Sequence, residues 1–246
     1  MNSRAPHNAP DAALLLAQAR SLPRLRVIAF EHDGKRYWVK RPEVPPLRLR
    51  LQKGNGQQAF HRELARLNAF AAKGAPVPPV LAQAPDLMVL ADVGIPLTHL
   101  AYGENADGMQ VLLSHAARAL TQLHACNLAH GRPRLRDICW DGAQIRFVDL
   151  EAGARLDAPR WRRARDLLVF LHSIWQNDPD ISVAAPAALA AYAAADSAQI
   201  VPLARRIARR LRLVGYLVAP LVWRDRKRNK TNSEFVAFAQ LLDFLA

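Results

Sequence analysis

Two stretches that lie close together in the chain decide the fold. Residues 130–138 read His-Gly-Arg-Pro-Arg-Leu-Arg-Asp-Ile, and residues 145–151 read Ile-Arg-Phe-Val-Asp-Leu-Glu. The Asp141-Gly142 pair between two short apolar runs predicts a β-hairpin, because Asp-Gly is favoured in two-residue hairpin turns. Asp137 precedes the first strand and Asp149 ends the second, so both carboxylates are expected at one end of the hairpin. Paired carboxylates suit a hard divalent cation and the phosphates that it carries.

Length and composition bound the class of protein. The chain has 246 residues, of which 51% are hydrophobic, enough for one large domain or two small lobes. Its two cysteines, Cys126 and Cys139, match no disulfide framework and no paired metal-ligand spacing, which favours a reducing compartment. No apolar run reaches the roughly 18–20 residues that span a bilayer, and the N-terminus lacks a signal-peptide pattern. The sequence therefore predicts a cytoplasmic protein.

The charge balance predicts an anionic partner. Lys and Arg number 34 against 21 acidic residues, a formal net charge of +13. Nucleic acid, acidic lipid and phosphorylated sugars all fit such a balance. Basic residues concentrate between Arg205 and Lys230, where Tyr216 and Trp223 are the only aromatic residues. Stacking on single-stranded nucleic acid has thin support there, so we rank nucleic acid below an anionic lipid or glycolipid.

Before residue 92 the pattern predicts strands and one long helix. After a structureless lead at 1–10, Asp11 is expected to cap a short helix with Leu14, Leu15 and Ala19 on one side. Four strands are expected, joined in pairs by the turns Asp33-Gly34 and Pro85-Asp86: 25–30, 35–40, 80–82 and 87–90. A helix over 58–72 places Glu63 at the border of its apolar face, which consists of Phe60, Leu64, Leu67 and Ala71.

Beyond residue 97 the pattern is mainly helical. Helices are expected over 108–125, 161–175 and 187–195, from Pro202, and from Ser233 to the end. The helix from Pro202 shows a predicted apolar face of Leu203, Ile207, Leu211 and Val214. Its opposite side is basic, and a separate basic tract is expected over 224–230. The fold class is α+β, with a lead and short helix at 1–20, a small antiparallel-sheet lobe at 21–94, and a helical lobe at 95–246.

The order of these features resembles the protein-kinase-like fold, and most of all the bacterial lipopolysaccharide core kinases that act on Kdo and heptose. The resemblance covers roughly residues 25–175. It rests on six features in order: the strand-end Lys40, the helix residue Glu63, the strand and connector at 87–94, the helix ending Leu123-His124-Ala125, the His130-Gly131 loop, and the strand-end Asp149.

This resemblance implies roles for individual residues. Lys40 would hold the α- and β-phosphates of ATP and pair with Glu63, while Asp137 and Asp149 would bind Mg²⁺. His130 would be a structural member of the catalytic loop. Asp166 would be a buried anchor of the same loop. The main chain of the connector would face the adenine, through Leu90, Ala91, Asp92 and Val93.

The chain departs from the kinase pattern at two places. The catalytic loop of kinases reads His-x-Asp, but Arg132 stands at the position of that Asp, and a guanidinium cannot accept a proton. No glycine-rich loop precedes Lys40, so the loop 47–58, with Gly54 and Gly56, is the candidate cover for the nucleotide. Arg132 would instead stabilise the phosphoryl group during transfer.

Two functions remain open from the sequence. One is an ATP- and Mg²⁺-dependent phosphotransferase with an atypical catalytic loop. Its acceptor would be anionic, such as a lipopolysaccharide or a lipid-linked sugar at the inner face of the membrane. The other is a pseudokinase-like binding module without turnover, which binds anionic lipid or another partner through its basic C-terminal region.

Overall fold

The computed structural model describes residues 11–43, 56–101, 106–150, 153–177 and 180–246, and these form two compact units. The first takes the described residues up to Asn68 together with Pro78–Asp92. The second takes Ala69–Val77 and Val93–Ala246. The lead expected at 1–10 and residues 47–55 of the expected nucleotide cover lie outside the described residues.

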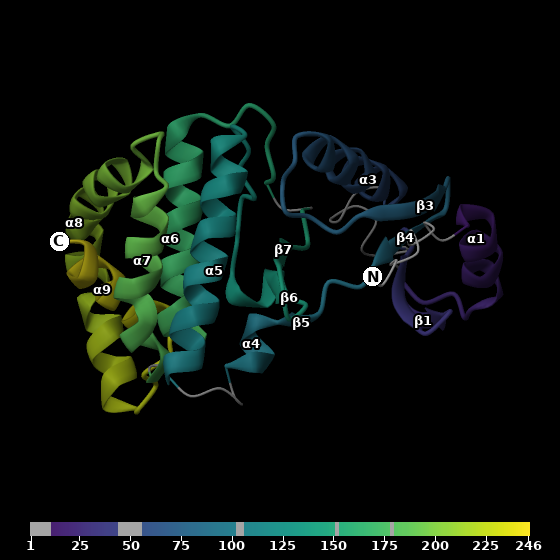
Figure 1. Cartoon of the computed structure of the whole chain (residues 1–246). Helices are drawn as coiled ribbons and strands as arrows, with labels where there is room; N and C mark the ends of the chain where they lie inside the picture. Colours follow the sequence, from purple (N-terminus) through teal and green to yellow (C-terminus); the bar gives the residue numbers. More distant parts are fainter. Residues whose placement is uncertain (1–10, 44–55, 102–105, 151–152, 178–179) are drawn as a thin grey trace, which may run out of the picture. The chain divides into compact units, whose positions relative to one another are not determined.

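The first unit is built on a four-stranded antiparallel sheet with the order β1-β2-β4-β3 (Figure 1). Its strands are β1 (Val27–His32), β2 (Lys35–Lys40), β3 (Val80–Ala84) and β4 (Leu87–Ala91). Asp33 and Gly34 join β1 to β2 with φ values of 49° and 68°. Two consecutive positive φ values are what a type I′ hairpin turn requires, so the Asp-Gly pair explains this hairpin.

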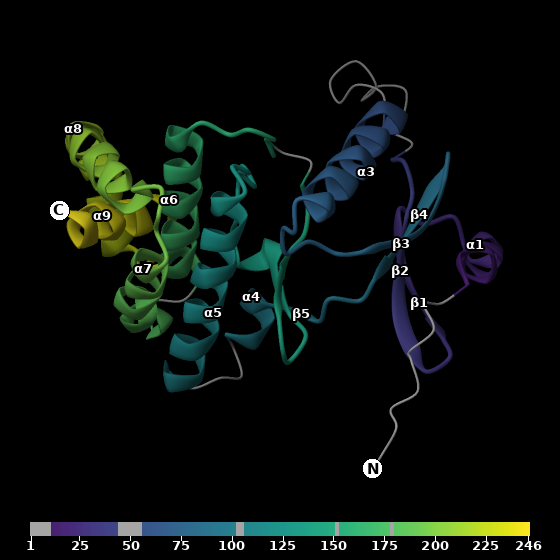
Figure 2. The ribbon, with the colours of Figure 1, turned by 45° about the horizontal axis from the view of Figure 1, so that its top comes forward.

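Helix α1 (Ala12–Ser21) covers one face of this sheet (Figure 2). Asp11 caps the helix as expected, since its side chain accepts a hydrogen bond from the Ala13 N–H at 2.8 Å. Leu15 and Ala19 are fully buried in the core that α1 shares with the strands. Leu14, expected on the same side, is 55% exposed, so the buried face of α1 is narrower than predicted.

The second face of the sheet carries the strand-end lysine. Side chains alternate along a strand, and Tyr37 and Val39 lie in the core with α1. Trp38 and Lys40 therefore project from the opposite face, where Lys40 meets Glu63 of helix α3 (Gly56–Ala72).

The buried face of α3 differs from the predicted one. Phe60, Glu63, Leu67 and Phe70 are buried, whereas Ala71 is exposed. Glu63 thus lies within the buried face and not at its border. The periodicity followed apolar residues only, whereas the ion pair with Lys40, which the resemblance implied, makes burial of this carboxylate acceptable.

The second unit combines a small sheet with six helices among its described residues. The sheet has the order β5-β6-β7, from β5 (Ile95–Pro96), β6 (Ile138–Trp140) and β7 (Ile145–Phe147). The helices are α4 (Leu97–Leu100), α5 (Ala106–Ala125), α6 (Arg160–Asn177), α7 (Ala185–Ala194), α8 (Ile200–Lys227) and α9 (Glu234–Leu245). Two short 3₁₀ turns, η1 (Leu135–Asp137) and η2 (Asp180–Ala184), complete it. α5 packs against α7, and α6 packs against α8 and α9 (Figure 1).

Helix α8 is longer than predicted, and its buried face is shifted from the predicted one. It continues through Pro220 to Lys227, so much of the expected separate basic tract is helical. Ala204, Ala208 and Val222 are buried on it, whereas Val214, predicted to be buried, is 42% exposed. Leu203, Ile207 and Leu211, the other predicted positions, are half-buried beside these residues.

Among the described residues, no helix is both long enough and apolar enough to cross a membrane.

Candidate functional site

In the first unit, a buried ion pair joins strand β2 to helix α3. Lys40 Nζ lies 2.5 Å from Glu63 Oε1, and their side chains are only 14% and 4% exposed. Breaking a buried pair by removing one partner leaves an uncompensated charge, so the pair ties the end of β2 to α3. It also gives the Lys40 ammonium a defined direction.

The connector after β4 is held by a hydrogen bond that the sequence pattern did not reveal. Trp38 Nε1 donates to Asp92 Oδ1 at 2.6 Å. Leu90 and Ala91 are still paired with β2 in the sheet, whereas Asp92 and Val93 follow its last paired residue. Leu90, Ala91 and Asp92 belong to the first unit, and Val93 begins the main part of the second.

In the second unit, both ring nitrogens of His130 are engaged by the main chain. Nε2 lies 2.8 Å from the Val148 carbonyl oxygen, and Nδ1 lies 3.3 Å from the Arg132 nitrogen. A carbonyl only accepts and an N–H only donates, so Nε2 carries the proton and Nδ1 accepts. This arrangement fixes the orientation of the imidazole ring and makes His130 a brace between the loop and the hairpin.

Asp166 of α6 holds the next residue of the loop. It is 1% exposed, and its two oxygens accept from the Gly131 N–H at 3.0 and 3.1 Å. Gly131 has φ +94°, a conformation that residues with a Cβ rarely adopt. Ser173, a second α6 residue that the sequence did not single out, accepts from the Leu135 N–H at 3.3 Å.

Asp137 and Asp149 are brought together at the end of the hairpin. The Val148 N–H donates to the Asp137 carbonyl oxygen at 2.9 Å, which fixes the residue before Asp149 beside Asp137. Asp149 has φ +63°, a region that non-glycine residues seldom occupy and that recurs at functional sites. Glu151, from the same sequence motif, lies outside the described residues.

The carboxyl of Asp137 is electrostatically unfavourable where it stands. It is 5% exposed, and its Oδ2 has no hydrogen-bond partner among the described residues. Burial raises the pKa of Asp137, and the negative charge of Asp149 adds to that rise, while His130, Arg136 and Arg132 oppose it. A buried oxygen without a partner, next to a second carboxylate, is an arrangement that a bound cation would relieve.

Arg132 stands beside the second carboxylate. Its Nη2 lies 3.9 Å from Asp149 Oδ2, and both side chains are partly exposed, at 37% and 39%. At this distance and exposure the pair contributes little to stability. The guanidinium does, however, lie where it can contact an anionic group bound next to Asp149.

The fit of Mg²⁺ to these residues can be tested on the donor set. Within the described part of the chain, no group of three or more His, Cys, Asp or Glu side chains is arranged to hold a metal ion. Mg²⁺ at nucleotide sites is commonly bound by one or two carboxylates plus phosphate oxygens and water. Asp137 and Asp149 therefore fit Mg²⁺ that arrives with a nucleotide, and do not fit a cage built from protein ligands alone.

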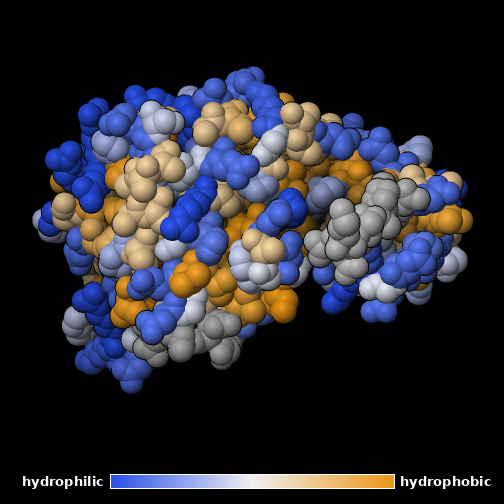
Figure 3. Space-filling view, in the orientation of Figure 1, coloured by the Kyte–Doolittle hydropathy of each residue, from blue (hydrophilic) through white to orange (hydrophobic). Residues whose placement is uncertain are grey.

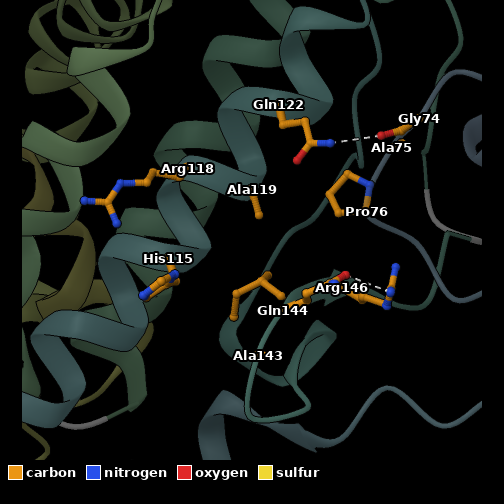
Figure 4. Close-up of a pocket in the computed structure, with 11 residues that line it drawn as sticks. Gly74, Ala75, Pro76, His115, Arg118, Ala119, Gln122, Ala143, Gln144 and Arg146 are labelled. Carbon is orange, nitrogen blue, oxygen red and sulfur yellow. Dashed lines mark hydrogen bonds between the residues drawn. The ribbon is translucent and has the colours of Figure 1, made fainter. Parts of the chain in front are cut away.

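A separate pocket in the second unit, of about 350 Å³, does not extend this site. It lies between α5 and the segments 74–76 and 143–146 (Figure 4). Gln122 is used there in a hydrogen bond to the Gly74 carbonyl, and Arg146 contacts Gln144 Oε1. Figure 4 shows the Arg118 side chain extending away from the pocket. Gln122 and Arg146 are thus occupied by contacts within the protein, and we assign this pocket no ligand.

Comparison with known proteins supports the fold and leaves the activity to be tested. No protein-family model matches the chain. A protein of Haemophilus influenzae, described as an uncharacterized protein, is 36% identical over 159 residues. These residues make up 64% of this chain and 65% of that protein, so the match spans less than two thirds of its length.

Among solved structures, the chain is similar to WaaP in its complex with acyl carrier protein. The TM-score is 0.51 at 17% sequence identity, and the similarity covers 91% of this chain and 97% of that one. The likeness is one of fold. It confirms the predicted α+β class: a small antiparallel sheet with a long helix, and a mostly helical part, consistent with the kinase-like fold.

Proposed function

We propose that this chain is a kinase-like phosphotransferase that uses ATP and Mg²⁺ to phosphorylate an anionic acceptor, such as a lipopolysaccharide or a lipid-linked sugar. The fold similarity to WaaP supports the kinase-like, lipopolysaccharide-related branch. The observation that carries the proposal is the buried Asp137 Oδ2, which has no hydrogen-bond partner among the described residues and lies in a loop fixed beside Asp149.

The roles follow from the chemistry of each group. Lys40, directed by Glu63, would bind phosphate oxygens, and the main chain of 90–93 would face the adenine. Asp137 and Asp149 would hold Mg²⁺, which neutralises phosphate charge when bound. Because both nitrogens of His130 are engaged, we assign it no proton transfer.

Arg132 would replace base catalysis with charge stabilisation. Transfer of a phosphoryl group passes through a loose transition state, and it depends mainly on positioning and on neutralising charge. General-base catalysis adds about 10²–10⁴-fold. An enzyme with Arg at this position is expected to be slow and still active.

The second candidate is a kinase-like binding module without turnover. It is favoured by one contact, the Arg132 guanidinium 3.9 Å from Asp149, because a cation of the protein already stands next to a carboxylate proposed for Mg²⁺. WaaP was solved with acyl carrier protein, which makes that protein the first protein partner to test for this chain. For either candidate we propose the cytoplasmic face of the inner membrane as the location.

The decisive experiment measures thermal stabilisation by a non-hydrolysable ATP analogue with and without Mg²⁺. The wild type is expected to gain stability only when both are present, and Asp149→Asn should lose that gain. Asp157→Asn is the matched control, since Asp157 also has positive φ and also pairs with a cation, Lys73 at 3.0 Å. A gain that persists in Asp149→Asn, or no gain in the wild type, would reject nucleotide binding at this site.

The lysine is tested in the same assay. Lys40→Met should abolish the ligand-induced gain, whereas Lys35→Met, an exposed lysine at the other end of β2, should retain it. The gain is read relative to each variant without ligand, because Lys40→Met also removes the ion pair between β2 and α3. Release of ADP by the wild type, absent in Asp149→Asn, separates the phosphotransferase from the binding module.

A further inference from the structure

The outward side of helix α8 exposes an unusual amount of apolar surface. Thirteen large hydrophobic residues are exposed among the described residues, and five of them lie on α8: Leu213, Val214, Tyr216, Leu217 and Trp223. Leu213, Tyr216, Leu217 and Trp223 are 64–79% exposed. Single exposed apolar residues are ordinary, but a cluster on one helix marks an interaction surface.

Helical spacing puts most of this cluster on one face. Residues 213, 216, 217, 220 and 223 recur at intervals of three or four, so they form one stripe. The opposite side of α8 is the packed one, where Ala204, Ala208 and Val222 are buried. The stripe, hereafter the α8 outer face, therefore points away from the helices that α8 packs against.

Basic residues extend the α8 outer face in both directions. Exposed arginines precede the apolar stripe by one to two turns, and further cations follow it: Arg205, Arg206, Arg209 and Arg210 before, and Arg224, Lys227 and Arg228 after. Lys227 Nζ lies 5.0 Å from the centre of the Trp223 ring, so the apolar and basic parts are in contact. At about 1.5 Å per residue, Arg206 and Lys227 are roughly 30 Å apart. Figure 3 shows strongly hydrophilic residues crowded at the end of the helical unit where Figure 1 places α8.

We propose that the α8 outer face docks on an anionic lipid bilayer, with the helix lying in the plane of the membrane surface. Cations at both ends would bind anionic headgroups, and Lys and Arg can keep their charge at headgroup level while their aliphatic stems cover apolar surface. Leu213 and Leu217 would enter the boundary between headgroups and acyl chains. Tyr216 and Trp223 are side chains that favour this boundary.

Other anionic partners match the same surface less well. Nucleic acid would neutralise the arginines, but its phosphates and sugars, which make most of its hydrogen bonds to proteins, present little apolar surface to two leucines that are 73% and 79% exposed. An acidic protein would need a groove about 30 Å long that fits both the apolar stripe and the cations on either side of it. A bilayer presents negative charge and hydrocarbon together over any such length. The inference uses only residues of α8 and does not rest on the proposed phosphotransferase activity.

The test is co-sedimentation of the full chain with vesicles of phosphatidylcholine alone or mixed with phosphatidylglycerol. The wild type should bind the mixed vesicles at low salt, bind the neutral ones weakly, and lose much of its binding at high salt. Leu213→Ser with Leu217→Ser should weaken binding to the mixed vesicles at least about tenfold. Arg206→Glu with Arg209→Glu should weaken it similarly.

Matched control variants show whether binding depends on the α8 outer face or on exposed apolar and basic residues anywhere on the protein. Val111→Ser with Val183→Ser removes two aliphatic side chains that are 56% and 66% exposed elsewhere, and it should leave binding unchanged. Arg20→Glu with Arg24→Glu makes the same change of charge in the first unit and should weaken binding less than the α8 pair does. Circular dichroism must show that each variant keeps the helical content of the wild type.

Three results would overturn the proposal. The first is failure of the wild type to sediment with mixed vesicles. The second is undiminished binding by the double leucine variant, which would mean that charge alone drives binding to the vesicles. The third is tighter binding to duplex DNA or to acyl carrier protein than to mixed vesicles, lost in the same double leucine variant, which would assign the α8 outer face to that partner.

Discussion

At the scale of single residues, Asp137 is kept in a position that costs stability while no cation is bound. Burial raises the pKa of its carboxyl, with Asp149 acting in the same direction. A raised pKa in the folded state means that the stability contributed by the neutral acid is lost as pH rises through that pKa. Asp137→Asn, which stays neutral, should therefore raise the melting temperature at pH 7 in the absence of Mg²⁺ and nucleotide, and this advantage should vanish below about pH 4.

Thermal melts across this pH range check the prediction, with Asp141→Asn as the contrast. Asp141 is exposed, and its Oδ1 accepts from the Ala143 and Gln144 N–H groups at 2.8 and 2.7 Å, so its replacement should lower or leave unchanged the melting temperature. A lower melting temperature for Asp137→Asn at pH 7 would show that the carboxylate is stabilising, contrary to our interpretation.

Buried His124 should make the stability of the protein depend on pH with a sign opposite to that of Asp137. It is 1% exposed, its Nδ1 lies 2.6 Å from the Tyr192 hydroxyl, and burial lowers its pKa. A lowered pKa means that the unfolded chain takes up a proton first, so stability is lost as pH falls below about 6.5. His124→Gln should remove part of this slope, at most about 1.4 kcal/mol per pH unit. Urea unfolding between pH 7 and pH 5 measures it, and the exposed His99→Gln should leave the slope unaltered.

At the scale of elements, the small sheet of the second unit depends on one close approach. Gly94 has φ +84°, and a Cβ there would lie 1.9 Å from the Trp140 carbonyl oxygen of β6. Gly142, in the turn between β6 and β7, has φ +95° but open space around the same position. Gly142→Ala should cost about 1–2 kcal/mol for the backbone conformation alone. Gly94→Ala should cost roughly 2–4 kcal/mol, because overpacking is added.

The measured quantity is the difference in free energy of unfolding between the Gly94→Ala and Gly142→Ala variants, taken from the main unfolding transition in denaturant. Equal destabilisation by both would mean that the segment at Gly94 moves aside at little cost, and that β5 is not held against β6 by this contact.

Elements with local signals were predictable, and faces set by tertiary partners were not. Asp11 as a cap and Asp33-Gly34 as a turn act through their own backbone, and both are found where the pattern indicates. The buried faces of α3 and α8 were misplaced because periodicity counts apolar residues. It cannot register that Glu63 is buried against a lysine from another element.

At the scale of the whole molecule, the residues of the candidate site were predicted from their order along the chain. The resemblance also implied the Lys40–Glu63 pair and the anchoring of the loop by Asp166, and both contacts are present. The Trp38–Asp92 hydrogen bond, which spans 54 positions, was not predicted. No local pattern encodes such pairs. The role of Asp137 as a metal ligand stays a prediction, and what the structure adds is a physical reason to test it, a buried oxygen without a hydrogen bond from the described residues.

The second unit is discontinuous in sequence, and this predicts where the chain can be cut. The segment 69–77 belongs to it, although 78–92 belongs to the first unit. The Phe147 N–H donates to the Pro76 carbonyl at 2.8 Å, Gln122 donates to the Gly74 carbonyl at 3.0 Å, and Val77 is 3% exposed. A fragment starting at the sequence-based boundary would lack all three interactions.

We therefore expect fragment 69–246 to be more stable than fragment 93–246 by about 3 kcal/mol or more. A buried side chain such as Val77 contributes about 1.5–3 kcal/mol, and two hydrogen bonds add about 1 kcal/mol each. Fragment 78–246 is the control, because it restores length and the β3–β4 sequence without 69–77, and it should be as unstable as 93–246. Urea unfolding followed by circular dichroism compares the three. If 78–246 matched 69–246, the gain would come from β3 and β4, and the segment 69–77 would have no stabilising role in the helical unit.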